Sequence, residues 1–166
     1  GLAYRAFDVQ MMTEMALALG LEDDATCFEK EAQRSCALFR DALFDGSRVM
    51  IRTQTACTLA ITMDLVGGAD YTEVSDTLVE LLEESNGYLT TGFVGTGLLC
   101  PALTKIGRSD LALQLLLNDQ YPSWLYEVDN GATTIWERWN SWTKEDGFGD
   151  DGMNSFNHYA FGAVCE

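Results

Sequence analysis

The residues best suited to chemistry lie in a short aromatic run near the C-terminal end of this sequence. Trp136, Trp139 and Trp142 fall within seven residues, and Trp124 lies a little upstream. Each large ring needs its own pocket and a partner for its N–H group, so such crowding is unusual for a core alone. Aromatic faces stack on the C–H faces of sugars, which favours a carbohydrate platform. The alternative is an aromatic cluster packed beneath a long loop.

Glu137 lies inside this run, between Trp136 and the pair Arg138-Trp139. An aromatic pocket disfavours the charged form of a carboxyl group, whereas a neighbouring arginine favours it. Depending on which effect is larger, such a group serves as a general acid or a general base. The alternative is a solvated glutamate–arginine pair on the surface.

His158 is the only histidine, and Asn154 and Asn157 precede it by four residues and one. In the helix that we expect to begin near Met153, these three side chains would lie on adjacent faces. Polar groups at the end of a helix are well placed to hold sugar hydroxyls, although a lone histidine is commonly structural. The chain has no Ser or Cys at a spacing that would support a hydrolytic triad.

Other polar motifs give no sign of a metal or a nucleotide. Residues 121–152 contain four aspartates: Asp129, Asp146, Asp150 and Asp151. Their spacing does not match the DxDxDG pattern of a calcium loop. We expect most of them to lie in solvated turns. Gly92, Gly95 and Gly97 lack the strand–turn–helix setting of a phosphate-binding loop. We therefore predict no metal and no cofactor.

Composition narrows the classes of partner. The chain has 166 residues, 47% of them hydrophobic, which suits one folded domain and argues against disorder. Its 26 acidic and 10 basic residues give a formal charge of −16, which argues against nucleic acid and anionic lipid as partners. No apolar run approaches the roughly 20 residues that span a bilayer. A neutral ligand such as a sugar fits this balance.

The cysteines favour free thiols over a disulfide framework or a zinc site. Their number is odd, their spacing is irregular and no two form a CxxC pair: Cys27, Cys36, Cys57, Cys100 and Cys165. We expect them to be buried and reduced, which slightly favours the cytoplasm. A homo-oligomer is left open.

Hydrophobic periodicity predicts helices joined by short turns. The segments with helical spacing lie at about 3–18, 23–44, 53–66, 72–84, 96–106 and 110–118, with a last helix from Met153. Residues 88–93 are β-prone and predict a short strand, and residues 121–152 have poor periodicity. Pro101 must start or kink the fifth helix.

The helices read as pairs in which the first member is apolar on more of its surface and the second is more charged. Residues 53–66 and 72–84 show the contrast best. An inner helix that is buried all round and an outer helix that is wet on one side would produce it. The fold class predicted is all-α, a partial toroid of about three and a half inner/outer pairs. Neither end shows a helix cap or stop, so we expect residues 1–166 to be part of one domain, truncated at both ends.

Two motifs resemble a known family. Residues 131–139 (GATTIWERW) and 152–162 (GMNSFNHYAFG) look like the bacterial α-L-rhamnosidases of glycoside hydrolase family 78. Shorter segments at 53–55, 89–93 and 121–124 resemble that family in the same order. The resemblance runs through nearly the whole chain.

This resemblance implies the C-terminal half of an (α/α)6 catalytic barrel that removes terminal α-L-rhamnose with inversion, from a rhamnosylated small molecule or oligosaccharide. Glu137 would act as general base on water, and His158 with Trp124, Trp136 and Trp139 would line the rhamnose subsite. The family's general acid lies in an upstream motif that nothing here matches. We therefore expect this segment alone to be inactive.

Four other functions compete with this one. A carbohydrate-binding module without catalysis would keep the aromatic platform but show no turnover. Another α/α-barrel glycosidase would keep the fold, as would a polysaccharide lyase, although a lyase needs basic residues where the 121–152 segment offers only Arg138 and Lys144. A helical-repeat interaction module would leave the Trp–Glu–Trp cluster without a purpose.

Overall fold

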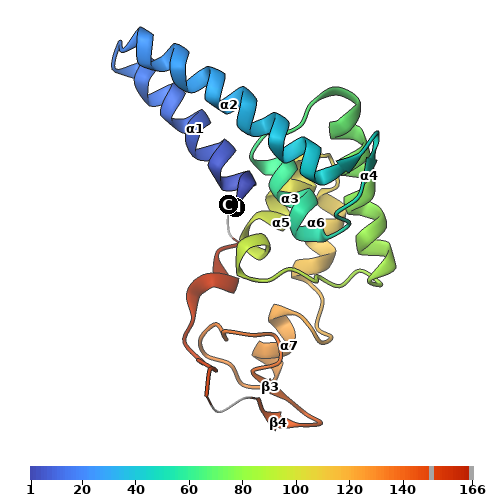
Figure 1. Cartoon of the computed structure of the whole chain (residues 1–166). Coiled ribbons are helices and arrows are strands. Elements are labelled where there is room, and N and C mark those ends of the chain that lie inside the picture. The colour runs from blue at the N-terminus through green and yellow to red at the C-terminus, as the bar shows by residue number, and fades with distance from the viewer. Residues whose placement is uncertain (150–151, 165–166) are drawn as a thin grey trace. The chain divides into compact units, whose positions relative to one another are not determined.

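The computed structural model describes residues 1–149 and 152–164, and the chain divides into two compact units, Gly1–Leu78 and Val79–Glu166. Helices dominate from α1 to α6, whereas the chain after α6 has only short elements (Figure 1). Each unit is described by itself.

The first unit begins with a helical hairpin. Helices α1 (Leu2–Ala18) and α2 (Glu22–Leu43) lie side by side (Figure 1). The buried positions of α1 are all alanines, and α2 also buries small residues. Small side chains bring two helix backbones close together, so this interface gains its stability from close packing. No helix among the described residues is long and apolar enough to cross a membrane.

The rest of the first unit shows the predicted contrast between inner and outer helices. After the strand pair β1 (Phe44–Asp45) and β2 (Arg48–Val49), helix α3 (Gln54–Thr62) is almost wholly buried. The Thr53 hydroxyl caps it by accepting a hydrogen bond from the Ala56 N–H at 3.1 Å. Helix α4 (Gly68–Glu84), whose last residues belong to the second unit, buries one stripe and exposes acidic residues on the other side.

The second unit is built around α5 (Phe93–Lys105), which packs against α6 (Ser109–Leu116) and against the 3-10 helix η1 (Tyr159–Gly162). Helix α7 (Trp124–Asp129) follows, capped by the Ser123 hydroxyl. The strands β3 (Trp142–Thr143) and β4 (Gly147–Phe148) form an antiparallel pair. Gly147 has a φ of 71°, which suits glycine at the end of this tight turn.

Two predicted elements are wrong. Residues 88–92 belong to no helix or strand, and α5 begins at Phe93, where the Thr96 N–H donates to the Gly92 carbonyl oxygen at 3.0 Å and closes the first turn. The helix predicted from Met153 is replaced by irregular chain as far as His158, the residue before η1. Asn154, Asn157 and His158 therefore share no helix face.

Smaller differences concern boundaries and thiols. The third helix ends at Thr62, before Asp64, whose φ of 52° is incompatible with a continuing helix. Pro101 lies inside α5 and does not start it. Cys57 and Cys100 are buried free thiols as predicted, but Cys27 is exposed and Cys36 only half-buried. Cys165 lies outside the described residues.

Candidate active site

Glu137 is held by a backbone frame formed by two distant segments. Its N–H donates to the Ser155 carbonyl oxygen at 2.9 Å, and the Ser155 N–H donates to the Glu137 Oε2 atom at 2.7 Å. The His158 N–H donates to the Ile135 carbonyl oxygen at 2.8 Å. Within the described residues the other carboxylate oxygen, Oε1, has no hydrogen bond. The carboxylate is thus fixed at one oxygen and available at the other.

Glu137 lines a cavity of about 540 Å3, here called the Glu137 cavity. This volume falls in the range of roughly 300–1,000 Å3 that small-ligand pockets occupy. Its wall combines apolar rings with polar groups: Thr90, Thr91, Gly92, Phe93, Tyr121, Glu137, Arg138, Trp139, Asn140 and Phe161. The described structure contains no Glu137–Arg138 ion pair, so the surface-pair interpretation is not favoured.

A stack of rings forms the apolar wall. Phe161 stacks on Trp139 with ring centroids 4.4 Å apart and planes 7° from parallel, and it also contacts Phe93 at 5.1 Å. The His158 ring in turn stacks on Phe93, with ring centroids 4.7 Å apart. Trp124 supports the stack from the side: its ring meets Trp139 edge-on, and its Nε1–H donates to the Phe161 carbonyl oxygen at 2.7 Å. Such contacts hold the rings in one orientation.

The predicted site residues therefore divide into two groups. Glu137 and Trp139 line the Glu137 cavity, and His158 stacks on one of its lining rings. Trp124 and Trp136 are 9% and 5% exposed and belong to the core beside the cavity. Their contact with substrate remains a prediction.

The two asparagines also lie off the cavity lining. The Asn154 side-chain N–H donates to the Ser141 carbonyl oxygen at 2.9 Å, which ties its segment to the chain before β3. Asn157 is exposed, and its backbone N–H donates to the Ser155 hydroxyl. Of the predicted turn aspartates, Asp129 and Asp146 are exposed. Asp150 and Asp151 lie outside the described residues.

Glu127 is the notable residue that sequence reasoning missed. It is 2% exposed, and its Oε2 atom accepts from the Trp136 N–H at 3.4 Å, next to Glu137 in the chain. Its Oε1 atom has no hydrogen bond among the described residues. Burial raises the pKa of Glu127 from 4.5 to about 7, although the Trp136 hydrogen bond opposes the rise. Its position three residues after Trp124, on the same face of a helix, was an available signal.

Comparisons with known proteins agree with the resemblance in the sequence. A family model described as the bacterial α-L-rhamnosidase six-hairpin glycosidase domain matches residues 2–166. The α-L-rhamnosidase of Alteromonas sp. (strain LOR) is 42% identical over 98% of this chain. That of Streptomyces avermitilis is 41% identical over 99%.

Solved structures give the same result. The structure of the S. avermitilis α-L-rhamnosidase complexed with L-rhamnose matches 98% of this chain with a TM-score of 0.91 and 40% identity. The native α-L-rhamnosidase of Aspergillus terreus matches 97% with a TM-score of 0.89 and 31% identity. The chain spans 16% and 19% of those two proteins, and 18% of the Alteromonas enzyme. The predicted fold class, an all-α partial (α/α)6 toroid, is confirmed. This chain belongs to the bacterial α-L-rhamnosidase six-hairpin glycosidase family.

Proposed function

We propose that the protein carrying this chain hydrolyses terminal α-L-rhamnosyl bonds, with Glu137 as the general base. The observation that carries the proposal is the Glu137 carboxylate itself. Glu137 lines a cavity of ligand size, and its carboxylate has one oxygen fixed by the Ser155 N–H and the other without a hydrogen bond among the described residues. A fixed carboxylate with one available oxygen can orient a water molecule and accept its proton.

The reaction that follows is a single displacement. Glu137 takes a proton from water as the water oxygen forms a bond to the anomeric carbon. The glycosidic C–O bond breaks on the opposite face, and an acid protonates the leaving oxygen, so the configuration inverts. Inverting enzymes place the two carboxyl groups roughly 6.5–9.5 Å apart to leave room for the water. We place the general acid in a part of the protein outside this sequence, because no motif here matches it.

The cavity wall supports rhamnose as the sugar. Rhamnose carries a methyl group where most hexoses carry a hydroxymethyl group, and the rings of Phe93, Trp139 and Phe161 offer an apolar surface for it. His158 accepts from the Ala160 N–H at its Nδ1 atom, at 3.4 Å. A neutral imidazole bonded in this way carries its proton on Nε2 and can donate it to a sugar hydroxyl.

The test is hydrolysis of an aryl α-L-rhamnoside by the complete protein and by its Glu137→Gln variant. Loss of a general base typically lowers kcat by about 10²–10⁴-fold, and we expect affinity for L-rhamnose to be kept. Glu14→Gln, which changes an exposed glutamate of α1, is the matched control and should keep full activity. Full activity in Glu137→Gln would move the base to another residue.

The stereochemistry is tested separately, by NMR of the sugar released in the first minutes. Inversion gives β-L-rhamnose first, and α-L-rhamnose as the first product would exclude the single displacement. A wild-type protein that binds L-rhamnose but cleaves no rhamnoside would favour the noncatalytic binding module.

A further inference from the structure

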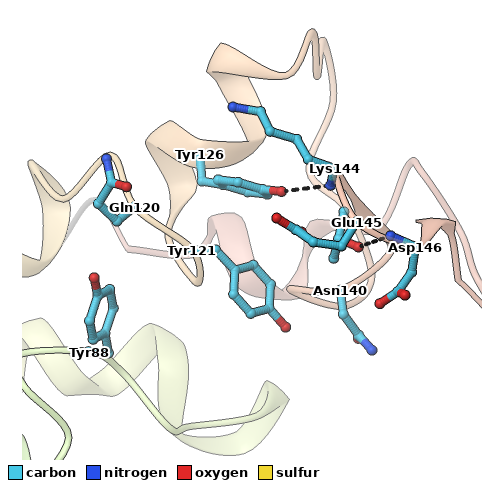
Figure 2. A pocket seen from close by; sticks show the side chains of 9 residues that line it. Tyr88, Gln120, Tyr121, Tyr126, Asn140, Lys144, Glu145 and Asp146 are labelled. Carbon is cyan, nitrogen blue, oxygen red and sulfur yellow. Dashed lines mark hydrogen bonds between the residues drawn. The ribbon is translucent and has the colours of Figure 1, made fainter.

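A second cavity, of about 590 Å3, adjoins the Glu137 cavity. The two share two lining residues, Tyr121 and Asn140, so they meet along these side chains. Figure 2 shows that the second cavity is lined by separate segments: the chain after α4, the chain leading into α7, α7 itself and the β3–β4 turn. We call it the tyrosine pocket.

Three tyrosines supply the aromatic part of its lining. Tyr88, Tyr121 and Tyr126 lie in the chain before α5, before α7 and within α7. Tyr121 and Tyr126 meet edge-on with ring centroids 5.4 Å apart, and the Tyr126 hydroxyl accepts from the Lys144 backbone N–H at 3.3 Å. Tyr121 is nevertheless 44% exposed. A tyrosine fixed at its edge and open on its surface offers a ligand both a ring face and a hydroxyl group.

The turn between β3 and β4 supplies the polar part. Lys144, Glu145 and Asp146 are exposed and line the tyrosine pocket. The Asp146 N–H donates to the Thr143 hydroxyl at 3.0 Å, which holds the turn without using the Asp146 carboxylate. One ammonium and two carboxylates provide donors and acceptors together, and a ligand rich in hydroxyl groups can use both kinds.

We propose that the tyrosine pocket binds the sugar ring that adjoins the terminal rhamnose in the substrate. The inference rests on the proposed function, since it places the reacting rhamnose in the Glu137 cavity. A neighbouring ring then lies within reach across Tyr121 and Asn140. The protein therefore prefers rhamnosyl oligosaccharides or rhamnosides of sugars over rhamnosides with a small alcohol.

The test compares two substrates in the complete protein: rhamnosyl-glucose disaccharides of different linkage, and methyl α-L-rhamnoside, whose methoxy group is too small to fill the tyrosine pocket. Tyr88→Ala and Asp146→Ala each change a residue that lines only the tyrosine pocket. Asp129→Ala, which changes an exposed aspartate that lines neither cavity, is the matched control.

We expect Tyr88→Ala to lower kcat/KM for the best disaccharide by about five- to ten-fold, the effect of losing one ring contact, and Asp146→Ala by a smaller factor. Activity on methyl α-L-rhamnoside should be unchanged, which also shows that each variant is folded. Equal losses on both substrates, or no loss on either, would overturn the assignment of the tyrosine pocket. A wild-type protein that cleaves neither substrate would overturn the proposed function itself, so the two failures are distinguishable.

Discussion

The α1–α2 hairpin and residues 121–164 place their large side chains in opposite ways. In α1 the buried positions are alanines, while large apolar side chains such as Met12, Met15 and Leu17 are exposed. In residues 121–164 the buried positions include large rings, among them Trp124, Trp136 and Phe161. Regular helices bond their own backbone groups, so they can pack through methyl groups alone.

Irregular chain has no such ladder, so side chains must bond its backbone groups. The Trp124 indole bonds a carbonyl oxygen, as does the Asn154 amide, and the carboxylates of Glu127 and Glu137 accept from backbone N–H groups. Residues 121–164 therefore need polar side chains to hold their backbone, and some of these side chains, such as Glu137, keep a second polar atom that can act on a ligand. Four predictions test this contrast, from the largest expected effect to the smallest.

Removal of a buried ring should have the largest effect. We expect Trp124→Ala to lower the free energy of unfolding by about 3–5 kcal/mol, as large-to-small core substitutions do, because the ring supports Trp139 and bonds the Phe161 carbonyl oxygen. Urea unfolding followed by circular dichroism measures it. Trp124→Phe should cost less, since it keeps most of the ring area. A loss below about 1 kcal/mol for Trp124→Ala would show that the ring is not a structural support.

The buried carboxyl of Glu127 should make stability depend on pH. Its folded-state pKa of about 7 exceeds its ordinary value of 4.5, so the folded protein binds more protons between these values. Its contribution therefore makes stability fall as pH rises from about 4.5 to 7, by up to about 3 kcal/mol, and level off above. Glu127→Gln should remove this component.

The measurement is the difference in unfolding free energy between wild type and Glu127→Gln at several pH values. Asp129→Asn, at an exposed position of the same helix, serves as the control and should track the wild type. A difference that stays constant from pH 4.5 to 7 would mean that folding does not raise the pKa of Glu127.

Overpacking should affect the hairpin less. Ala6 is fully buried in α1, so Ala6→Leu forces the two helices apart and should cost about 1–3 kcal/mol. Ala18→Leu adds the same atoms at an exposed position of α1 and should change stability by less than about 0.5 kcal/mol. Equal effects at the two positions would contradict close packing at Ala6. Denaturant midpoints are sufficient for this comparison.

The smallest effect belongs to the ion pair between Arg5 and Glu31. These side chains meet at 2.5 Å but are 55% and 34% exposed. Exposed pairs contribute roughly 0.2–1 kcal/mol, so Arg5→Ala should cost no more than this. The loss should shrink further in about 1 M salt, where screening is strong. A loss that is large and independent of salt would assign Arg5 a packing role.

The features predicted correctly from the sequence are those that depend on neighbouring residues. The helix pattern from Ala3 to Ala18 was readable because hydrophobic periodicity acts over a few residues. The helix from Met153 was wrong because the Ser155 backbone bonds Glu137, which lies 18 residues away. Local periodicity contains no information about such a partner.

The site shows the same division. Glu137 and Trp139 were predicted from composition and motif, and the structure brings both to one cavity. The burial of Glu127 and the tyrosine pocket depend on which groups of α7 turn inward and on how the β3–β4 turn folds. Both features depend on contacts between residues that are far apart in the sequence, so a local stretch of sequence does not reveal them.

The Glu137 carboxylate is positioned by an amide of the main chain, and this has a consequence for engineering. Every amino acid except proline offers the same N–H at position 155, so a library that varies this position should retain a correctly placed carboxylate in nearly all of its members. Among the described residues the Ser155 hydroxyl accepts one local hydrogen bond, from the Asn157 N–H. Position 155 should therefore tolerate most substitutions, and proline is the one replacement to leave out.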